Sequence, residues 1–358
     1  MTANVTPGFS QTRTLPGSFG VSASGAATYN IPIAVPPGTA GVSPSLSIEY
    51  SSQAGDGIVG FGWSLGGLVS IGRCPQTMAQ DGVLGSVKYD GNDRFCLDGQ
   101  RLVAISGAYG GDGTEYRTEV DSSTKVVSHG AVGGGPSWFE VRTKAGHVMQ
   151  LGGSADSQIL AQGKAVVRSW ALNKLSDTKG NYFTVTYTND AANGQAYPIE
   201  VDYTGNSSAG LVPYNKIQFV YEARPDVAPQ YQAGSLIRTA VRLTDIRTFA
   251  GASLVGDYKL SYSLSGATRR SLLGSIQLCG GDGSCLPTST VSWTSGGNGA
   301  FAAVSQLVNG FLGFPPNANW TPVVGDFNGD GKTDFAFVIA SSIWTFMSNG
   351  DGTFASGG

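Results

Sequence analysis

A glycine-rich apolar stretch at residues 56–73 constrains the fold more than any other part of the sequence. It interleaves six glycines with large apolar side chains, among them Phe61, Trp63 and Leu65. Glycine allows positive φ angles and a close approach of another chain, and within a strand it marks a bulge, a bend or a tight crossing. The aromatic side chains favour burial, because they carry much of the burial energy of a short segment. We therefore predict a bent, buried pair of strands near the centre of a β-structure.

Ser64 lies within the same stretch, in a Gly-x-Ser-x-Gly pattern at residues 62–66. This pattern is the nucleophile elbow of α/β-hydrolases, which requires a strained strand-to-helix turn followed by an acid and a histidine. Only His129 and His147 could serve, and no helical pattern follows the serine. We predict that the chain is not an enzyme, and a hydrolase using Ser64 is the weakest alternative.

The composition indicates an all-β protein. Glycine accounts for 53 of 358 residues, about twice its usual ~7% share, and charged residues make up 13%, about half the usual ~25%. Such a composition is typical of many short strands joined by tight turns. The net charge of −3 comes without a basic cluster, so we expect no nucleic-acid partner. No run of 18 apolar residues is present, so we expect no transmembrane helix.

Alternation of apolar and polar residues predicts the individual strands. Pro32 lacks an N–H donor, so we expect its strand at the edge of a sheet. Repeated Asp-Gly pairs, which begin at Asp81, Asp90, Asp98 and Asp112, predict hairpin turns between strands. The predicted strands cover residues 29–35, 45–51, 182–187, 216–222, 237–243 and 258–264, and Val291 and Trp293 close the series.

The four cysteines form two pairs that are close in sequence, Cys74 with Cys96 and Cys279 with Cys285. Four cysteines allow three pairings. We favour the disulfides Cys74–Cys96 and Cys279–Cys285, because the segment from Cys279 to Cys285 resembles a hairpin tip. Four reduced, buried thiols are the alternative, since disulfides persist only in oxidising compartments. Neither pair has the spacing of a zinc site.

An acidic loop near the end of the sequence carries the clearest chemical signal. It places oxygen donors at positions 1, 3, 5, 7 and 9, and calcium binds six to eight such hard oxygen ligands. An EF-hand is excluded, because position 12 would be Phe337 rather than Glu and the flanking residues favour strands. We predict a structural Ca²⁺ site, with an unoccupied Asx-turn loop as the alternative. The predicted ligands are Asp326, Asn328, Asp330 and Asp334 and the carbonyl oxygen of Lys332.

Residues 17–52 and 57–67, together with the strings CPQTMAQDG (74–82), YDGNDRFCLDGQRLV (89–103), YEARPDV (221–227) and IRTAVRLTDIRTF (237–249), resemble the SpvB/TcdB-type amino-terminal domain of Tc insecticidal toxin B components and Rhs-type secreted proteins. The resemblance covers roughly residues 15–295. It implies a non-enzymatic module of a secreted bacterial toxin-complex protein, which contributes to an encapsulating β-shell and docks partners. Downstream Rhs and propeller segments and toxin-complex subunits are the partners it implies.

The acidic loop and its flanking strands resemble an FG-GAP/VCBS repeat, the blade unit of integrin-like β-propellers. A propeller needs about four to eight blades, so a single blade predicts that the sequence is part of a longer protein. The expected organisation is a flexible lead-in at residues 1–16, a large Gly-rich, sandwich-like or shell-like antiparallel β-domain at 17–295 and one blade at 301–358. A Gly-rich linker is expected at 295–300.

Two further expectations concern location and the main alternative function. We expect the protein to be secreted, although residues 1–16 show no basic or apolar segment of a signal peptide, so export by another route or a cytoplasmic stage before export stays open. The alternative from another class is a secreted adhesin or glycan-binding β-module that uses exposed Trp and Tyr side chains.

Overall fold

The computed structural model describes residues 14–294, 321–339, 341–351 and 353–356. The chain divides into two compact units, Met1–Ser295 and Gly296–Gly358. The linker predicted at residues 295–300 lies outside the described residues, as does most of the predicted lead-in.

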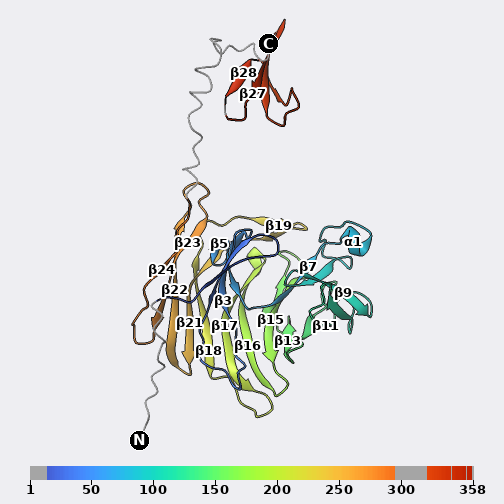
Figure 1. The fold of residues 1–358 in the computed structure, drawn as a ribbon. Coiled ribbons are helices and arrows are strands. Elements are labelled where there is room, and N and C mark those ends of the chain that lie inside the picture. The colour runs from blue at the N-terminus through green and yellow to red at the C-terminus, as the bar shows by residue number, and fades with distance from the viewer. Residues whose placement is uncertain (1–13, 295–320, 340, 352, 357–358) are drawn as a thin grey trace. The chain divides into compact units, whose positions relative to one another are not determined.

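A 16-stranded antiparallel sheet forms most of the first unit (Figure 1). Nearly all of its neighbouring strands are also neighbours in sequence, as expected for strands joined by short hairpins. In spatial order the sheet runs through β13 (Val148–Leu151), β12 (Trp138–Arg142), β11 (Lys125–His129), β10 (Glu115–Thr118), β9 (Gln100–Ser106), β8 (Arg94–Leu97), β7 (Ser70–Cys74), β15 (Val167–Ser176), β16 (Asn181–Asp190), β17 (Gln195–Asn206), β18 (Asn215–Ala223), β21 (Val241–Ala250), β22 (Ser253–Leu264), β23 (Ser271–Gly280) and β24 (Ser289–Thr290), with β14 (Gln158–Leu160) beside β15.

One end of this sheet closes into a small barrel. Strand β13 pairs with β15 as well as with β12, so β7 to β13 and β15 form a closed ring of eight strands. Aromatic rings fill its interior: Trp170 is fully buried and lies edge-on to Phe95 and Phe139, with ring centroids 5.4 and 5.0 Å away. The indole N–H of Trp170 donates to the carbonyl oxygens of Pro136 and Ser137, so its polar atom is satisfied inside the core.

The amino-terminal part of the chain forms a second layer. A four-stranded sheet contains β1 (Ser18–Val21), β2 (Ala27–Pro32), β3 (Ser47–Ser51) and β6 (Trp63–Gly66), and a small hairpin pairs β4 (Asp56–Gly57) with β5 (Gly60–Phe61). The chain between β2 and β3 is hydrogen-bonded to the long sheet, because Tyr258 Oη accepts from the Ala34 N–H at 2.8 Å and Tyr203 Oη donates to the Pro36 carbonyl at 3.0 Å. The main hydrophobic core lies between these two layers and extends into the barrel.

The glycine-rich stretch is bent, as predicted, but only part of it is buried. Gly60 and Gly62 have positive φ angles of 92° and 76°, a conformation that favours glycine. A Cβ at Gly60 would lie 2.8 Å from the carbonyl oxygen of Ser271 in β23, so glycine also permits close contact with the long sheet. Val59 and Trp63 are buried beside it, whereas Phe61 is half-buried.

Several sequence predictions are wrong in detail. Val291 and Trp293 lie in no strand, because β24 ends at Thr290. Strand β2 is not an edge strand, because it pairs with both β1 and β3, and Pro32 is tolerated at its end, beyond the register with β1. Residues 237–243 form no single strand, since β20 (Ser235–Ile237) pairs only with β19 (Gln230–Gln232) before β21 begins. Asp81-Gly82 does not form a hairpin turn, because Asp81 ends the helix α1 (Met78–Asp81) and Gly82 is its left-handed cap.

Helices are few and short among the described residues: α1 and the 3₁₀ turns η1 (Ala155–Ser157) and η2 (Ala191–Asn193). The described part of the chain contains no helix with the length and apolar character needed to cross a membrane.

The second unit contains a four-stranded antiparallel meander of β25 (Thr321–Gly325), β26 (Asp334–Ile339), β27 (Ser342–Ser348) and β28 (Phe354–Ser356). Ala336 and Phe346 are its buried apolar residues, and the rings of Phe335 and Phe354 stack with centroids 4.6 Å apart. A propeller blade has the same number of strands. The assignment to an FG-GAP/VCBS repeat stays a prediction.

Replacing Trp170 with Ala tests the barrel core. We expect the free energy of unfolding to fall by about 3–5 kcal/mol, because the change removes a large buried ring and leaves a cavity among packed aromatic side chains. Chemical denaturation measures it. The matched control is Ile105→Ala in β9 of the same barrel, where the side chain is exposed and we expect a change within about 0.5 kcal/mol. Equal effects of the two variants would contradict this assignment of the core.

Candidate functional site

The residues considered for serine catalysis do not form a nucleophile elbow. Ser64 lies in β6 opposite Glu49 of β3, on an antiparallel strand, and the next strand rather than a helix follows it. The His129 ring stacks on Trp138 with centroids 4.1 Å apart, and the His147 backbone N–H donates to Thr143 in a turn. Ser64 has none of the local geometry that the hydrolase hypothesis requires.

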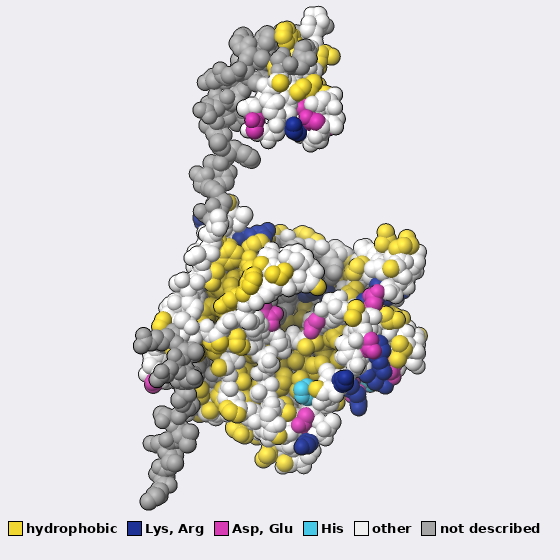
Figure 2. Space-filling model, in the orientation of Figure 1, with side chains coloured by type: hydrophobic (Ala, Val, Ile, Leu, Met, Phe, Trp, Pro, Cys, Tyr) yellow, Lys and Arg dark blue, Asp and Glu magenta, His cyan; other side chains and the backbone are white. Residues whose placement is uncertain are grey.

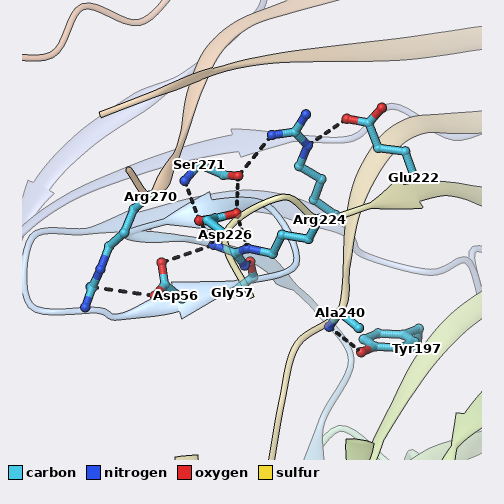
Figure 3. A network of polar contacts seen from close by, with 10 residues as sticks. Asp56, Gly57, Tyr197, Glu222, Arg224, Asp226, Ala240, Arg270 and Ser271 are labelled. Carbon is cyan, nitrogen blue, oxygen red and sulfur yellow. Dashed lines mark hydrogen bonds and ion pairs between the residues drawn. The ribbon is translucent and has the colours of Figure 1, made fainter. Parts of the chain in front are cut away.

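A buried polar cluster of the first unit is centred on Arg224, just after β18 (Figure 3). Its guanidinium donates to both carboxylate oxygens of Asp226, at 2.8 and 3.0 Å, and to Asp56 at 3.1 Å. It also donates to the Gly57 carbonyl at 2.7 Å. Arg224 thus joins the β4–β5 hairpin of the amino-terminal layer to the end of a long-sheet strand.

Asp226 connects this cluster to a third segment. Its carboxylate accepts from the backbone N–H and the hydroxyl of Ser271, both at 2.5 Å, at the start of β23. Burial by itself raises the pKa of Asp226, but the hydrogen bonds from Arg224 and Ser271 and the charge of Arg224 outweigh it. The pKa of Asp226 therefore lies well below its usual range, and the carboxylate stays charged at neutral pH.

A polar cavity of about 90 Å³ adjoins the Arg224 cluster and is lined in part by Gln195, Gln230 and Thr239. Four donor contacts of the Arg224 guanidinium are already made within the protein, so little hydrogen-bonding capacity is left for a ligand. The arrangement is suited to holding three segments together rather than to binding an anion.

Charged side chains on the visible face of the first unit gather over the barrel strands (Figure 2). Among the charged side chains of the barrel strands, Glu115 pairs with Arg117 and Lys125, and Glu140 pairs with Arg142. Because Arg117, Lys125 and Arg142 have acidic partners, these three basic groups do not form a positive stripe of the kind found in nucleic-acid interfaces.

The structure contains both favoured disulfides, Cys74–Cys96 and Cys279–Cys285. The first joins the neighbouring strands β7 and β8 of the barrel. The second closes the expected hairpin tip after β23, where the Gly280 N–H donates to the Ser284 carbonyl at 2.7 Å.

The acidic loop of the second unit uses its side-chain oxygens within the loop. Asp326 accepts from the backbone N–H groups of Gly329, Asp330 and Gly331, and Asp334 is fully buried and accepts from two further amides. Asp330 lies 3.3 Å from the Lys332 ammonium. Within the described residues, no three His, Cys, Asp or Glu side chains are grouped as a metal site. The oxygen donors suit calcium chemically, and their hydrogen bonds to loop amides are of the Asx-turn type. The calcium site stays a prediction.

The Arg224 cluster and a second buried ion pair, Arg73 with Asp93 at 3.1 Å, were not predicted as sites. The only sequence signal for the first was the Arg-Pro-Asp string at residues 224–226, and for the second the Asp-rich string at 89–103. Arg224 also pairs with Asp56, 168 residues earlier, and Arg73 and Asp93 lie 20 residues apart. No local pattern reveals either contact.

Comparisons with known proteins define the class of this fold. The structure has a TM-score of 0.67 to TcdB2-TccC3 at 17% identity, over 96% of this chain and 20% of that chain. The Tc holotoxin pore of Photorhabdus luminescens gives a TM-score of 0.64 at 16% identity, over 94% of this chain and 19% of that one. The N-terminal domain of the effector protein SpvB from Salmonella typhimurium strain LT2 gives 0.55 at 19% identity, over 70% of this chain and 98% of that one.

These similarities place the chain among β-domains of the type found in Tc toxins and SpvB. The family model described as Salmonella virulence plasmid 65kDa B protein matches residues 21–209, more than half of the sequence. The chain belongs to this SpvB family. It spans about one fifth of the length of the two Tc chains. No curated protein sequence matches it.

Replacing Asp226 with Asn tests the Arg224 cluster. We expect the free energy of unfolding at pH 7 to fall by about 3 kcal/mol, because the buried guanidinium loses its main charged partner. The folded-state pKa of Asp226 is depressed, so its stabilisation is present above the unfolded pKa of about 4 and is lost as pH falls below it. Urea denaturation from pH 7 to pH 2 should therefore show a shallower pH dependence for the variant.

The control is Glu140→Gln, which breaks the exposed pair with Arg142 and should cost no more than about 1 kcal/mol. A variant at Asp226 with wild-type stability and wild-type pH dependence would contradict the role given to the cluster.

Proposed function

We propose that this chain is a non-enzymatic structural module of a secreted toxin-complex protein, which forms part of the wall of an encapsulating β-shell and docks against neighbouring segments. The observation that carries the proposal is membership of the SpvB family together with a fold shared with about one fifth of TcdB2-TccC3. A module that matches this fraction of a longer chain is suited to be one part of a larger assembly.

Physical features of the first unit support a wall-forming role. A 16-stranded sheet presents a large rigid surface, and most of its strands are joined by hydrogen bonds on both sides. The layer packed on it is held by a buried ion-pair cluster rather than by apolar contacts alone. Rigidity of this kind serves containment, whereas catalysis commonly requires mobile loops.

Secretion is part of the same proposal. Two disulfides support it, because disulfides persist in oxidising compartments and are rare in the cytosol. Partners of the module would be toxin-complex subunits and downstream Rhs or propeller segments of the kind that the family resemblance implies.

Electron microscopy of the complete gene product, with any polypeptide encoded downstream, tests the shell proposal. We expect a closed hollow particle in which the first unit occupies part of the wall. A peptide tag fused to the carboxyl terminus of the complete product should resist added protease as long as the particle is intact. An open or extended particle, or a tag cleaved as fast as in the unfolded protein, would overturn the proposal.

We also propose that the second unit binds Ca²⁺ through Asp326, Asn328, Asp330, Asp334 and the Lys332 carbonyl, as one FG-GAP/VCBS-type blade. The number of oxygen donors in one short loop supports this. Binding would require calcium to replace the Lys332 ammonium beside Asp330 and to draw carboxylates away from loop amides. That competition favours weak binding.

Two measurements on the 358-residue chain test this site. Titration calorimetry measures the heat of calcium binding, and thermal unfolding with and without calcium measures the shift in melting temperature. We expect a dissociation constant of about 0.1–1 mM, as in extracellular calcium modules, and its loss in Asp330→Asn. Asp282→Asn is the control, because Asp282 accepts from the Ser284 N–H in a similar turn of the first unit. Absence of heat and of any shift in melting temperature at 10 mM calcium would exclude the site.

A further inference from the structure

An apolar groove lies between the amino-terminal layer and the long sheet. Its volume is about 350 Å³, and it runs between residues 34–37, which follow β2, and residues of β21, β22 and β23. None of the described residues that line it is charged. The side chains that remain half-buried or exposed in its walls are those of Ala34, Val35, Pro36, Pro37, Ala250 and Val255. Because these side chains are apolar, covering them with other apolar groups is favourable.

The floor of the groove is closed and its nearby polar groups already have partners. Leu278 and Tyr258 lie at the floor and are 8% and 1% exposed, so they support the walls rather than offering open side chains. The Ala34 N–H donates to Tyr258 Oη at 2.8 Å, and the Pro36 carbonyl accepts from the Tyr203 hydroxyl at 3.0 Å. The groove therefore suits an occupant that is held by contact of its apolar side chains with the walls.

The described chain begins beside this groove. Strand β1 pairs with β2 in an antiparallel register that starts with Ser18 opposite Asn30. The same register, continued towards the amino terminus by three residues, places Leu15 opposite Ile33, and both side chains are buried in the same core. One residue further along, the chain lies opposite Ala34, the first residue of the groove wall.

The segment that precedes this point is long enough to fill the groove. Residues 1–13 lie outside the described residues and are joined to Thr14. An extended chain advances about 3.3 Å per residue, so Phe9 can reach about 16 Å from Thr14. The wall from Ala34 to Pro37 has a length of only about 10 Å by the same measure. Every part of the groove is therefore within reach of Phe9.

The sequence of this segment has the pattern of a half-buried strand. Its odd positions are apolar from the first to the ninth residue, and its even positions are Thr, Asn, Thr and Gly. Strict alternation predicts an extended segment with one apolar face. Leu15 is at an odd position too and is buried, which is consistent with the same face turned towards the core. The apolar residues are Met1, Ala3, Val5, Pro7 and Phe9.

We propose that residues 1–13 bind in this groove as an extended segment, with the Phe9 ring against Val35, Pro36 and Val255. The segment then covers apolar surface of the long sheet and attaches the start of the chain to it. This gives a structural role to residues that composition alone suggests are a flexible lead-in. The proposal is independent of the shell-forming role and of the Arg224 cluster.

Limited proteolysis of the 358-residue chain provides the first test. Trypsin cleaves after Lys and Arg, and Arg13 is the only such residue before Thr14. Since a docked segment is cleaved through its open form, Phe9→Asp should speed cleavage after Arg13 about tenfold, as measured by mass spectrometry. The matched control is Thr6→Asp, which adds the same charge at an even position and should leave the rate unchanged.

A second pair of variants tests the groove itself. Ala250→Asp places a charge at the groove wall and should also speed cleavage after Arg13 about tenfold. The control is Ala252→Asp, because Ala252 is equally classed as exposed, two residues further on, and does not line the groove.

NMR of the methyl-labelled chain locates the contact. An aromatic ring shifts the signals of nearby methyl groups, so Phe9→Asp should move the methyl signals of Val35 and Val255. Those of Val103 and Val120, which are exposed in the barrel region, should stay unchanged. Thr6→Asp should move none of the four, and unchanged signals elsewhere show that each variant is folded.

Three results would overturn the proposal. One is an equal rate of cleavage after Arg13 in the wild type and in both Asp variants of the segment. Another is a set of Val35 and Val255 methyl signals that Phe9→Asp does not move. The third is movement of these signals on dilution of the wild-type chain but not in Phe9→Asp, which would assign the groove to a contact between copies.

Discussion

The packing of the amino-terminal layer onto the long sheet depends on a close backbone contact that only a glycine-rich segment permits. The Leu243 N–H in β21 donates to the Ile58 carbonyl at 2.7 Å, between the two glycines of the β4–β5 hairpin. Gly60 fits against β23 because it has no Cβ, and Val59 beside it is fully buried. The hairpin thereby covers the apolar face of strands that would otherwise be open to water.

Arg224 makes this contact specific. An apolar layer can slide on an apolar sheet, whereas a guanidinium with donor contacts to Asp56, Gly57 and Asp226 fits only one relative position. Breaking such a buried pair is costly, since the charge left behind has no solvent to stabilise it. Ser271 completes the cluster from the start of β23, so the polar contacts and the glycine contact reinforce the same arrangement. Stability and positional specificity are thus supplied by different residues in the same small region.

Local patterns predicted the all-β class and several elements of the fold. Alternation at Tyr258 and Leu260 correctly identified their buried face, and Asp98-Gly99 forms the two-residue turn between β8 and β9 with positive φ at both positions. Alternation of apolar and polar residues does not predict burial or strand ends correctly where contacts between distant segments determine them. Leu264 shares the apolar period but is 37% exposed near the end of its strand, and the break after Ile237 follows from pairing of β20 with β19 rather than from composition.

The candidate sites show the same difference between local contacts, which the sequence predicts, and contacts between separate segments, which it does not. The disulfide Cys279–Cys285 could be inferred from sequence because its two cysteines lie within one hairpin. The ion pair between Arg73 and Asp93 could not, because it joins residues from separate segments of the barrel. A cavity in the barrel region is still further from local inference. It has a volume of about 450 Å³ and is lined by residues of three connections that are separate in the sequence, at 90–95, 108–111 and 131–135.

Strand β15, which closes the barrel, belongs both to the barrel and to the open part of the long sheet. Its first half pairs with β7 and β14, and its second half pairs with β13 and β16. Since side chains alternate between the two faces of a strand, an insertion or deletion of one residue within Val167–Ser176 would invert the orientation of every position beyond it. Both the barrel lining and the first strands of the open sheet would then be misaligned together. Length variation during evolution is therefore far less tolerable in this ten-residue strand than in the surface hairpins, even where those hairpins carry longer loops.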